Sequence, residues 1–168
     1  MGSVFMSCNS KSIKVTSVPN PKVGVPPNTT QPAEIIEKEE RLEGRVQFIK
    51  GDNLEAAIAL AKSEKKPVFI DFYADWCAPC KVLEESVFMD YDVAEYMNKN
   101  VINVRVNIEK GKGASIKEQM YVRVLPTLLF LDSNGDEIAR KEALPLIEEF
   151  KKMMKTAVWK VKNPSGQP

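Results

Sequence analysis

Two cysteines separated by two residues constrain this chain more than any other feature of its sequence. Cys77 and Cys80 come shortly after the apolar, β-prone segment 68–73. If that segment is a strand and a helix begins at Cys77, the first thiol lies where unpaired backbone N–H groups favour a thiolate. The second thiol then lies one helical turn behind it. The spacing therefore predicts a site for thiol–disulfide exchange.

The composition excludes several other uses of these cysteines. The chain has no histidine, so a cysteine nucleophile activated by histidine is excluded. Three cysteines cannot complete a structural zinc site, which needs about four Cys or His ligands, unless two chains share it. Lys and Arg number 24 against 23 Asp and Glu, so no global field attracts nucleic acid or an anionic membrane. We therefore expect no metal, no cofactor and no nucleic-acid partner.

The length and the distribution of residue types predict one folded domain between two tails. The 168 residues are 43% apolar, which is enough for one ordinary core. Residues 1–45 are expected to form a flexible tether and lead-in, since residues 1–30 are poor in large apolar side chains and rich in Ser, Thr, Asn and Pro. For residues 34–45, a short helix and a solvated linker are both open. We expect the domain at 46–157 and a tail at 158–168.

The segment that ends at Cys8 resembles the end of a bacterial lipoprotein signal. In such a signal a small residue precedes a cysteine that becomes acylated, and Ser7 takes that place here. Only seven residues precede Cys8, so the basic region and most of the apolar region are missing. Two interpretations stay open: a lipid anchor in an extracytoplasmic space, and an unmodified cysteine in a disordered tail. The longest apolar run of the domain, residues 128–131, is far below the ~20 residues that span a bilayer.

Hydrophobic periodicity after residue 45 alternates between the periods of strands and helices. Strands are predicted at these segments: 46–50, 67–73, 101–108, 127–131 and 137–142. Helices are predicted after Asp52, which would form a capping box with Glu55, and at these segments: 77–88, 93–98, 114–120 and onward from Pro145. The last helix should turn an apolar stripe inward: Leu146, Ile147, Phe150, Met153 and Met154. The order βαβαβαββα predicts an α/β fold, a mixed central sheet with helices on both faces.

The order of these elements and the residues around the cysteines resemble the thioredoxin-fold thiol:disulfide oxidoreductases. The resemblance rests on Tyr-Ala-Asp-Trp-Cys-Ala-Pro-Cys-Lys at 73–81, on Asp71 six residues before the first cysteine, and on Val-Leu-Pro-Thr at 124–127. It covers residues 46–157. Within the superfamily, residues 66–88 are most similar to the periplasmic C-terminal domain of the bacterial membrane thiol:disulfide interchange protein. A thioredoxin-like fold is therefore the expected architecture.

Positions within this motif suggest separate roles for its residues. Cys77, at the helix N-terminus and expected to be the more exposed, is the candidate nucleophile, and Cys80 would resolve the mixed disulfide. Pro79 fits the first helical turn, where its missing N–H is not needed. Asp71 lies in an otherwise apolar strand, and the resemblance implies that it is buried and passes protons to and from Cys80. The alternative is an edge-strand aspartate that faces water.

Two further charged residues are candidates for tuning the site. Cys77, Cys80 and Glu84 stand at i, i+3 and i+7, so one helix face carries both sulfurs and a carboxylate. The resemblance implies that Glu84 and Asp71 raise the pKa of the nucleophile, which opposes the effect of the helix end. Arg105 falls where many thioredoxins have a lysine near the aspartate. For both Glu84 and Arg105, a solvated side chain is the alternative.

The resemblance also implies a surface that contacts the partner chain. Pro126 would be a cis-proline against the active-site disulfide that exposes the backbone of Leu125 to an incoming chain; an ordinary trans proline is the alternative. Trp76, Ala78 and Pro79 would contact the partner, although a mainly packing role for Trp76 is equally open. Many thioredoxins have a glycine after the last strand, whereas this chain has Glu-Ala-Leu-Pro at 142–145, which leaves one wall of the groove undefined.

These observations predict an enzyme that exchanges a Cys77–Cys80 dithiol or disulfide with protein thiols and disulfides, including an upstream electron donor. We expect a monomeric protein-disulfide reductase in the periplasm or cell envelope, with membrane contact only through a lipid on Cys8. An oxidase or isomerase with the same site, a non-catalytic binding module and a cytoplasmic location are the alternatives. Reduction potentials in this fold run from about −270 to about −120 mV, so the motif alone leaves the direction of electron flow open.

Overall fold

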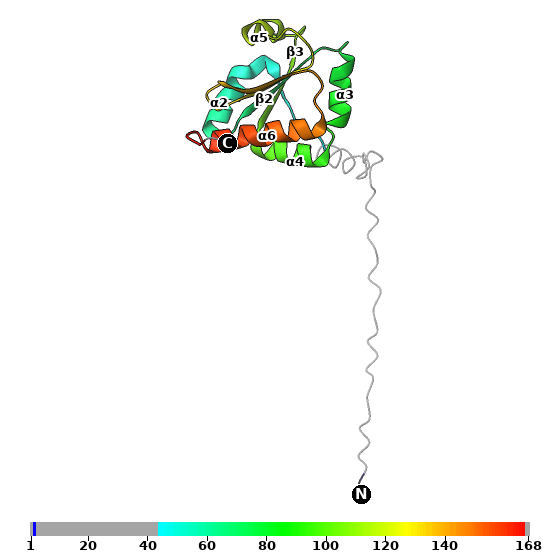
Figure 1. Ribbon diagram of the computed structural model, residues 1–168, viewed down its shortest axis with the longest axis vertical. Coiled ribbons are helices and arrows are strands. Elements are labelled where there is room, and N and C mark those ends of the chain that lie inside the picture. Colours follow the sequence, from blue (N-terminus) through cyan, green and yellow to red (C-terminus); the bar gives the residue numbers. More distant parts are fainter. Residues whose placement is uncertain (1, 3–43, 167–168) are drawn as a thin grey trace, which may run out of the picture. The chain divides into compact units, whose positions relative to one another are not determined.

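The computed structural model describes residue 2 and residues 44–166, with a five-stranded mixed sheet at the centre of the domain (Figure 1). The strands are β1 (Ile49–Lys50), β2 (Val68–Tyr73), β3 (Ile102–Asn107), β4 (Thr127–Leu131) and β5 (Glu137–Glu142). Their order is β1-β3-β2-β4-β5; β3 pairs in parallel with β1 and β2, and β4 runs antiparallel to β2 and β5. The predicted mixed sheet is therefore confirmed. Cys8 and the predicted tether lie outside the described residues, apart from residues 2, 44 and 45.

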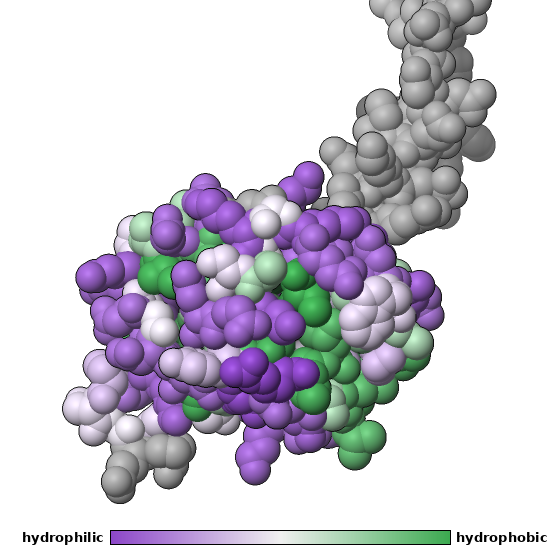
Figure 2. Space-filling model, turned by 90° about the horizontal axis from the view of Figure 1, so that it is seen from above, coloured by the Kyte–Doolittle hydropathy of each residue, from purple (hydrophilic) through white to green (hydrophobic). Residues whose placement is uncertain are grey.

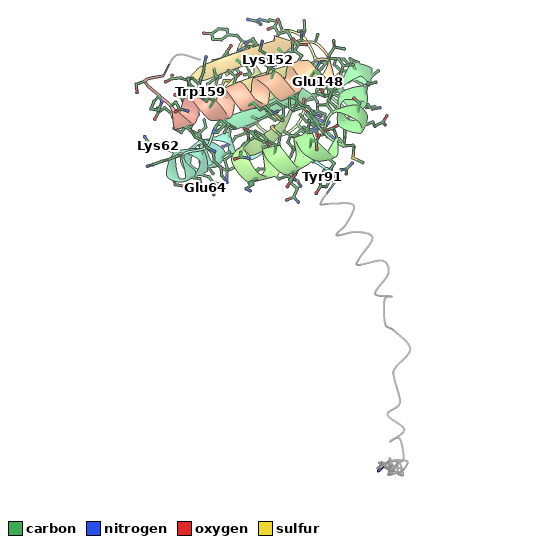
Figure 3. The ribbon with its side chains drawn as sticks, turned by 60° about the horizontal axis from the view of Figure 1, so that its bottom comes forward. Lys62, Glu64, Tyr91, Glu148, Lys152 and Trp159 are labelled. Carbon is green, nitrogen blue, oxygen red and sulfur yellow. A yellow bond between two sulfur atoms is a disulfide. The ribbon has the colours of Figure 1, made fainter. Side chains whose placement is uncertain are left out.

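Helices cover both faces of this sheet. They are α2 (Leu54–Glu64), α3 (Ala78–Ser86), α4 (Tyr91–Asn100), α5 (Gly113–Gln119) and α6 (Ile147–Lys162), with a short 3₁₀ turn, η1 (Gly51–Asn53). Buried residues of α3, α4 and α6 share one core cluster with the sheet, and those of α2 and α5 share the other. The helices α4 and α6 run side by side (Figure 3). The expected arrangement of helices on both faces is confirmed.

The central strand β2 separates the two cores. Its residues alternate between the faces, so Phe69 packs with α3, α4 and α6, whereas Ile70 and Phe72 pack with α2 and α5. Phe69 lies at the centre of an aromatic cluster, with ring centroids 4.8 Å from Phe130 and 5.4 Å from Phe150. Asp71 has the same parity as Phe69, so its carboxyl group faces the side of the sheet that α3 covers.

Two predicted features at the start of the domain are wrong. The predicted strand 46–50 is reduced to β1, because the N–H of Val46 donates to the carbonyl of Phe88 and that of Gln47 to Oδ1 of Asn98. Those bonds tie residues 46 and 47 to the α3–α4 region instead of to β3. Asp52 lies inside η1 and is not the N-cap residue of α2; that residue is Asn53, which makes no side-chain capping bond.

The end of the domain also differs from its prediction. Leu146 is 79% exposed, so it does not belong to the inward stripe of the last helix. It is the N-cap residue of α6, where the backbone is still extended. The residue before it, Pro145, is buried. The helix continues to Lys162, past the expected domain boundary at residue 157, and Val158 is buried within it.

The other boundaries agree closely with the periodicity. The predicted break between two helices occurs at Asp90, whose carboxylate accepts the N–H of Val93 at 3.0 Å and caps α4. The predicted hairpin joins β4 to β5, and Gly135 adopts φ 97° in its turn.

Within the described part of the chain, no helix is both long and apolar enough to cross a membrane. Figure 2 shows a largely hydrophilic face with hydrophobic side chains gathered on one side.

Candidate active site

The two cysteines of the motif form a disulfide at the N-terminus of α3. Their Cα atoms are 5.3 Å apart, and Cys77 is the N-cap residue of the helix. The N–H of Cys80 donates to Sγ of Cys77 at 3.2 Å. The predicted placement of Cys77 at a helix end is confirmed. After reduction, the same N–H would donate to a Cys77 thiolate and stabilise it.

Both cysteines are buried in the disulfide form, so the expected greater exposure of Cys77 amounts to a marginal difference. Cys77 is 2% exposed and Cys80 is 1% exposed. Both sulfurs belong to a small buried cluster with Ala74, against which Tyr73, Ile108 and Leu125 pack. Tyr73 ends β2, Ile108 follows β3 and Leu125 lies shortly before β4. The motif alone could not predict that these residues pack together. Both cysteines are therefore largely shielded from solvent in the disulfide form.

Asp71 is completely buried in the middle of β2. Its Oδ2 accepts a hydrogen bond from Nε of Arg105 at 3.0 Å, and no described group donates to its Oδ1. Burial raises the pKa of Asp71 to about 7, although the charge and hydrogen bond of Arg105 act to lower it. The alternative of a water-facing aspartate is wrong. This carboxyl group can both accept and release a proton near neutral pH.

Arg105 connects Asp71 to Glu84. Asp71 and Arg105 are register partners on neighbouring parallel strands, so their side chains leave the sheet on the same face. Nη1 of Arg105 lies 2.9 Å from Oε2 of Glu84, and its guanidinium carbon lies 4.2 Å from the centroid of the Tyr73 ring. Burial disfavours the charge of Arg105, but the facing carboxylates outweigh it and raise its pKa. The alternative of a solvated arginine is wrong, since its side chain is 18% exposed.

Glu84 is paired, although it is not fully buried. Its side chain is 38% exposed, and the contact that positions its carboxylate is the one with Arg105. The structure thus brings Asp71, Arg105 and Glu84 together beside the helix that carries the disulfide. Glu84 reaches Asp71 through Arg105, and its negative charge acts to raise the pKa of Asp71.

A second charged cluster, which the sequence reasoning missed, lies just beyond the strand ends. Oδ2 of Asp75 lies 2.6 Å from Nζ of Lys110, and Oδ1 accepts a bond from Nδ2 of Asn107 at 2.9 Å. The hydrogen bond from Lys110 is the largest cause of a lowered pKa for Asp75. Because β2 and β3 are parallel, with Tyr73 opposite Asn107, the segments that follow them begin side by side. That register was the signal that could have revealed this cluster.

Three of the residues expected to contact a partner are exposed near the disulfide, whereas Leu125 is half-buried. Trp76 is 66% exposed, so a mainly packing role is wrong, and its Nε1 donates to Oε1 of Glu109 at 2.8 Å. Ala78 and Pro79 are exposed in the first turn of α3. The Leu125–Pro126 peptide bond is cis, and Pro126 is buried.

The segment 142–145 is the groove wall whose shape the sequence left undefined. In it, Leu144 is 39% exposed, whereas Pro145 is buried. Among residues 44–166, no group of three or more His, Cys, Asp or Glu side chains could hold a metal ion.

Known proteins share both this sequence pattern and this architecture. A family described as thioredoxin-like matches residues 49–133. The thiol:disulfide interchange protein DsbD of Vibrio vulnificus (strain CMCP6) is 34% identical over 119 residues, which is 64% of this chain and 20% of that protein. The DsbD of Yersinia enterocolitica is 40% identical over 86 residues, 51% of this chain and 14% of that protein. The chain therefore corresponds to a small part of these relatives.

The solution structure of a thioredoxin from Thermus thermophilus has the same fold. It aligns with a TM-score of 0.61 at 20% identity, over 71% of this chain and 93% of the thioredoxin. The family match includes β2, α3 with its disulfide, and β4, which together position Asp71, Cys77 and Cys80. The chain therefore belongs to the thioredoxin-like family of thiol:disulfide oxidoreductases.

Proposed function

We propose that this protein reduces disulfides of partner proteins, with the Cys77–Cys80 dithiol as the electron source. The Cys77 thiolate attacks one sulfur of the partner disulfide, forms a mixed disulfide and releases the first partner thiolate. The Cys80 thiolate then attacks Sγ of Cys77, which forms the intramolecular disulfide and releases the second partner thiolate. Two electrons pass from the dithiol to the partner, and an upstream dithiol donor restores the reduced state.

Asp71 is the proposed proton acceptor for the second step. Cys80 must lose its proton before it can attack, and a carboxyl group with a pKa of about 7 can take up that proton at neutral pH. Arg105 occupies Oδ2, so Oδ1 is the oxygen left to bind the proton. Glu84 assists by holding the other side of the guanidinium. The observation that carries the proposal is that the buried Asp71 is linked through Arg105 to Glu84, on the helix whose N-terminus holds the disulfide.

The partner is proposed to dock on the surface formed by Trp76, Ala78 and Pro79, next to the half-buried Leu125 and the buried Pro126. Trp76 supplies an exposed apolar ring, and Leu125 packs against the disulfide cluster, so a chain bound here would lie next to the sulfurs. Similarity to the interchange proteins supports a location in the periplasm or cell envelope. Lipid attachment at Cys8 is the proposed anchor, and it is tested by mass spectrometry of the protein purified from membranes.

Replacement of Cys80 with alanine tests the cycle directly. The variant should accumulate mixed disulfides with partner proteins through Cys77, and the C77A/C80A double variant should accumulate none. Wild-type protein should also accelerate insulin reduction by a small thiol donor. A reduction potential nearer about −270 mV supports the reductase direction, whereas one nearer about −120 mV would identify an oxidase instead. Partners that bind C80A without forming any mixed disulfide would indicate a binding module without exchange.

A further inference from the structure

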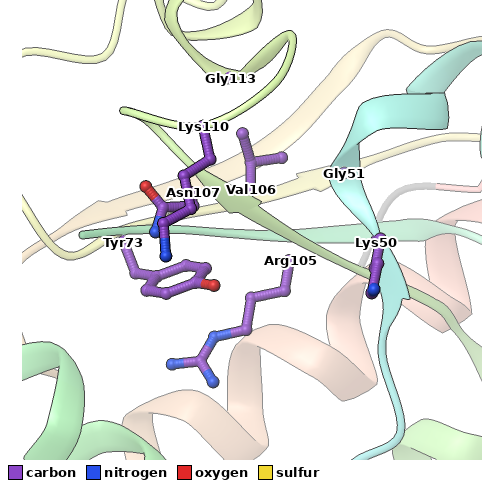
Figure 4. Close-up of a pocket in the computed structure, with 8 residues that line it drawn as sticks. All are labelled: Lys50, Gly51, Tyr73, Arg105, Val106, Asn107, Lys110 and Gly113. Atoms are coloured by element: carbon purple, nitrogen blue, oxygen red, sulfur yellow. The ribbon is translucent and has the colours of Figure 1, made fainter. Parts of the chain in front are cut away.

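Tyr73, which packs against the disulfide cluster, also lines a cationic cavity. Its volume is about 250 Å³, and it opens where β3 ends beside β1 (Figure 4). Lys50, Arg105 and Lys110 line it, together with Tyr73 and Asn107, and its lining contains no Asp or Glu. Figure 4 shows these side chains around the hollow, with the Tyr73 ring beside the guanidinium of Arg105. The cavity thus combines three cations with a phenol and an amide, all of which can donate hydrogen bonds.

The carboxylates that balance two of these cations are not part of the cavity wall. Arg105 is paired with Asp71 and Glu84, and Lys110 is paired with Asp75. Lys50 differs, because the structure gives it no ion pair within residues 44–166. Its ammonium group is exposed at the rim of the cavity and remains uncompensated.

Two glycines allow the backbone to form part of the cavity wall. A Cβ atom at Gly113 would clash with the carbonyl oxygen of Asn107, and one at Gly51 would lie 2.8 Å from that of Arg105. Both segments therefore pass so close to β3 that a Cβ atom does not fit between them and the strand. Any side chain at these positions would push the segments away from β3 and change the shape of the hollow.

We propose that this cavity binds a small oxyanion, either free phosphate or the carboxylate of a larger ligand. A volume of about 250 Å³ is below the roughly 300–1,000 Å³ of pockets that enclose drug-sized ligands, so the cavity fits a single anionic group. Planar guanidinium and mobile ammonium groups together suit phosphate and carboxylate oxygens. Tyr73 packs against the Cys77–Cys80 cluster, so the bound anion would lie one side chain away from the disulfide. The site differs from the proposed docking surface for protein chains.

Amide NMR spectra of the full chain in its disulfide form test the proposal independently of exchange activity. Inorganic phosphate is titrated while sodium chloride keeps the ionic strength constant, and the signals of Gly51, Asn107 and Gly113 are followed. We expect saturable shifts centred on these residues, and succinate should displace phosphate from them. Lys50→Gln should weaken phosphate binding by about tenfold, as expected for the loss of one charge-assisted contact, and Lys50→Arg should retain most of the affinity.

Lys152→Gln is the matched control. Lys152 is exposed on α6, away from the cavity lining, and the substitution removes the same charge (Figure 3). Its phosphate affinity should equal that of the wild type. Equal weakening in the Lys50 and Lys152 variants, shifts that do not saturate, or phosphate and succinate acting on separate residues would overturn the proposal.

Discussion

Two aspartates four residues apart lie on either side of the end of β2, and their environments have opposite effects. Asp71 is buried inside the strand and paired with Arg105, whereas Asp75 lies past the strand end in solvent and is paired with Lys110. Burial raises the pKa of Asp71 to about 7, while the hydrogen bond from Lys110 lowers that of Asp75. Each carboxylate has a cationic partner, so burial is what separates a group that can exchange protons at neutral pH from a fixed ion pair.

Substitution of the two aspartates should have very different effects on the rate of exchange, and this is the largest expected difference. Asp71→Asn removes the proposed proton acceptor, so the rate of disulfide reduction near pH 7 should fall by about 100-fold, at the low end of general acid–base contributions. Asp75→Asn should change it by less than about twofold, because its ion pair is exposed. Stopped-flow measurement with a disulfide-containing peptide gives both rates, and equal losses would contradict the assigned roles.

Stability should respond to pH in opposite ways at the two positions. The pKa of Asp71 is raised in the folded state, so its ionisation destabilises the fold progressively from about pH 4 to about pH 7. Asp71→Asn removes this effect, so it should increase the free energy of unfolding by about 2–3 kcal/mol more at about pH 8 than at about pH 5. Urea unfolding at both pH values measures the difference. A gain that is the same at both would mean that Asp71 does not titrate in this range.

Charge changes around Asp71 should move its titration in opposite directions. Arg105→Gln removes the cation that lowers the pKa of Asp71, so the midpoint should rise. Glu84→Gln removes a negative charge that raises it, so the midpoint should fall, and by less, since Glu84 contributes less than Arg105 does. Carboxyl-carbon NMR titration follows both variants. Midpoints that move in the same direction would show that Arg105 does not connect the two carboxylates electrostatically.

The smallest predicted effect concerns the exposed pair itself. The lowered pKa of Asp75 means that it stabilises the folded state above its unfolded pKa, and this contribution is lost as pH falls through its folded pKa. Asp75→Asn should therefore lower the melting temperature slightly at neutral pH and not at all in strong acid. Added salt should reduce the difference, because it screens exposed charges. A loss that persists in acid would point to packing instead of charge.

The sequence predicted the centre of the molecule better than its connections. The strands β2 and β4 are runs of apolar residues buried on both faces, so their limits follow from composition. Asp71 was identifiable because a charge within such a run is costly unless it is paired or protonated. The place of Cys77 followed from the change from strand to helix.

The features that were missed depend on contacts distant in sequence. Residues 46 and 47 bond to Phe88 and Asn98, about forty to fifty positions away, so local alternation could not distinguish them from a strand. Leu146 has the right spacing for the apolar stripe of α6 but precedes its first turn. The burial of Cys77 comes from Tyr73, Ile108 and Leu125, which only the folded sheet brings together.

The pKa of Asp71 in the disulfide form is the measurement that tests the account most directly, because the cysteines do not titrate in that state. Carboxyl-carbon NMR across about pH 3 to about pH 9 would follow it, with Asp71→Asn to identify its signal and Asp75 as the internal reference. The account predicts a midpoint at about 7 for Asp71 and one below the ordinary value for Asp75. A midpoint for Asp71 near its ordinary value would contradict the claim that burial makes this carboxyl group a proton acceptor at neutral pH.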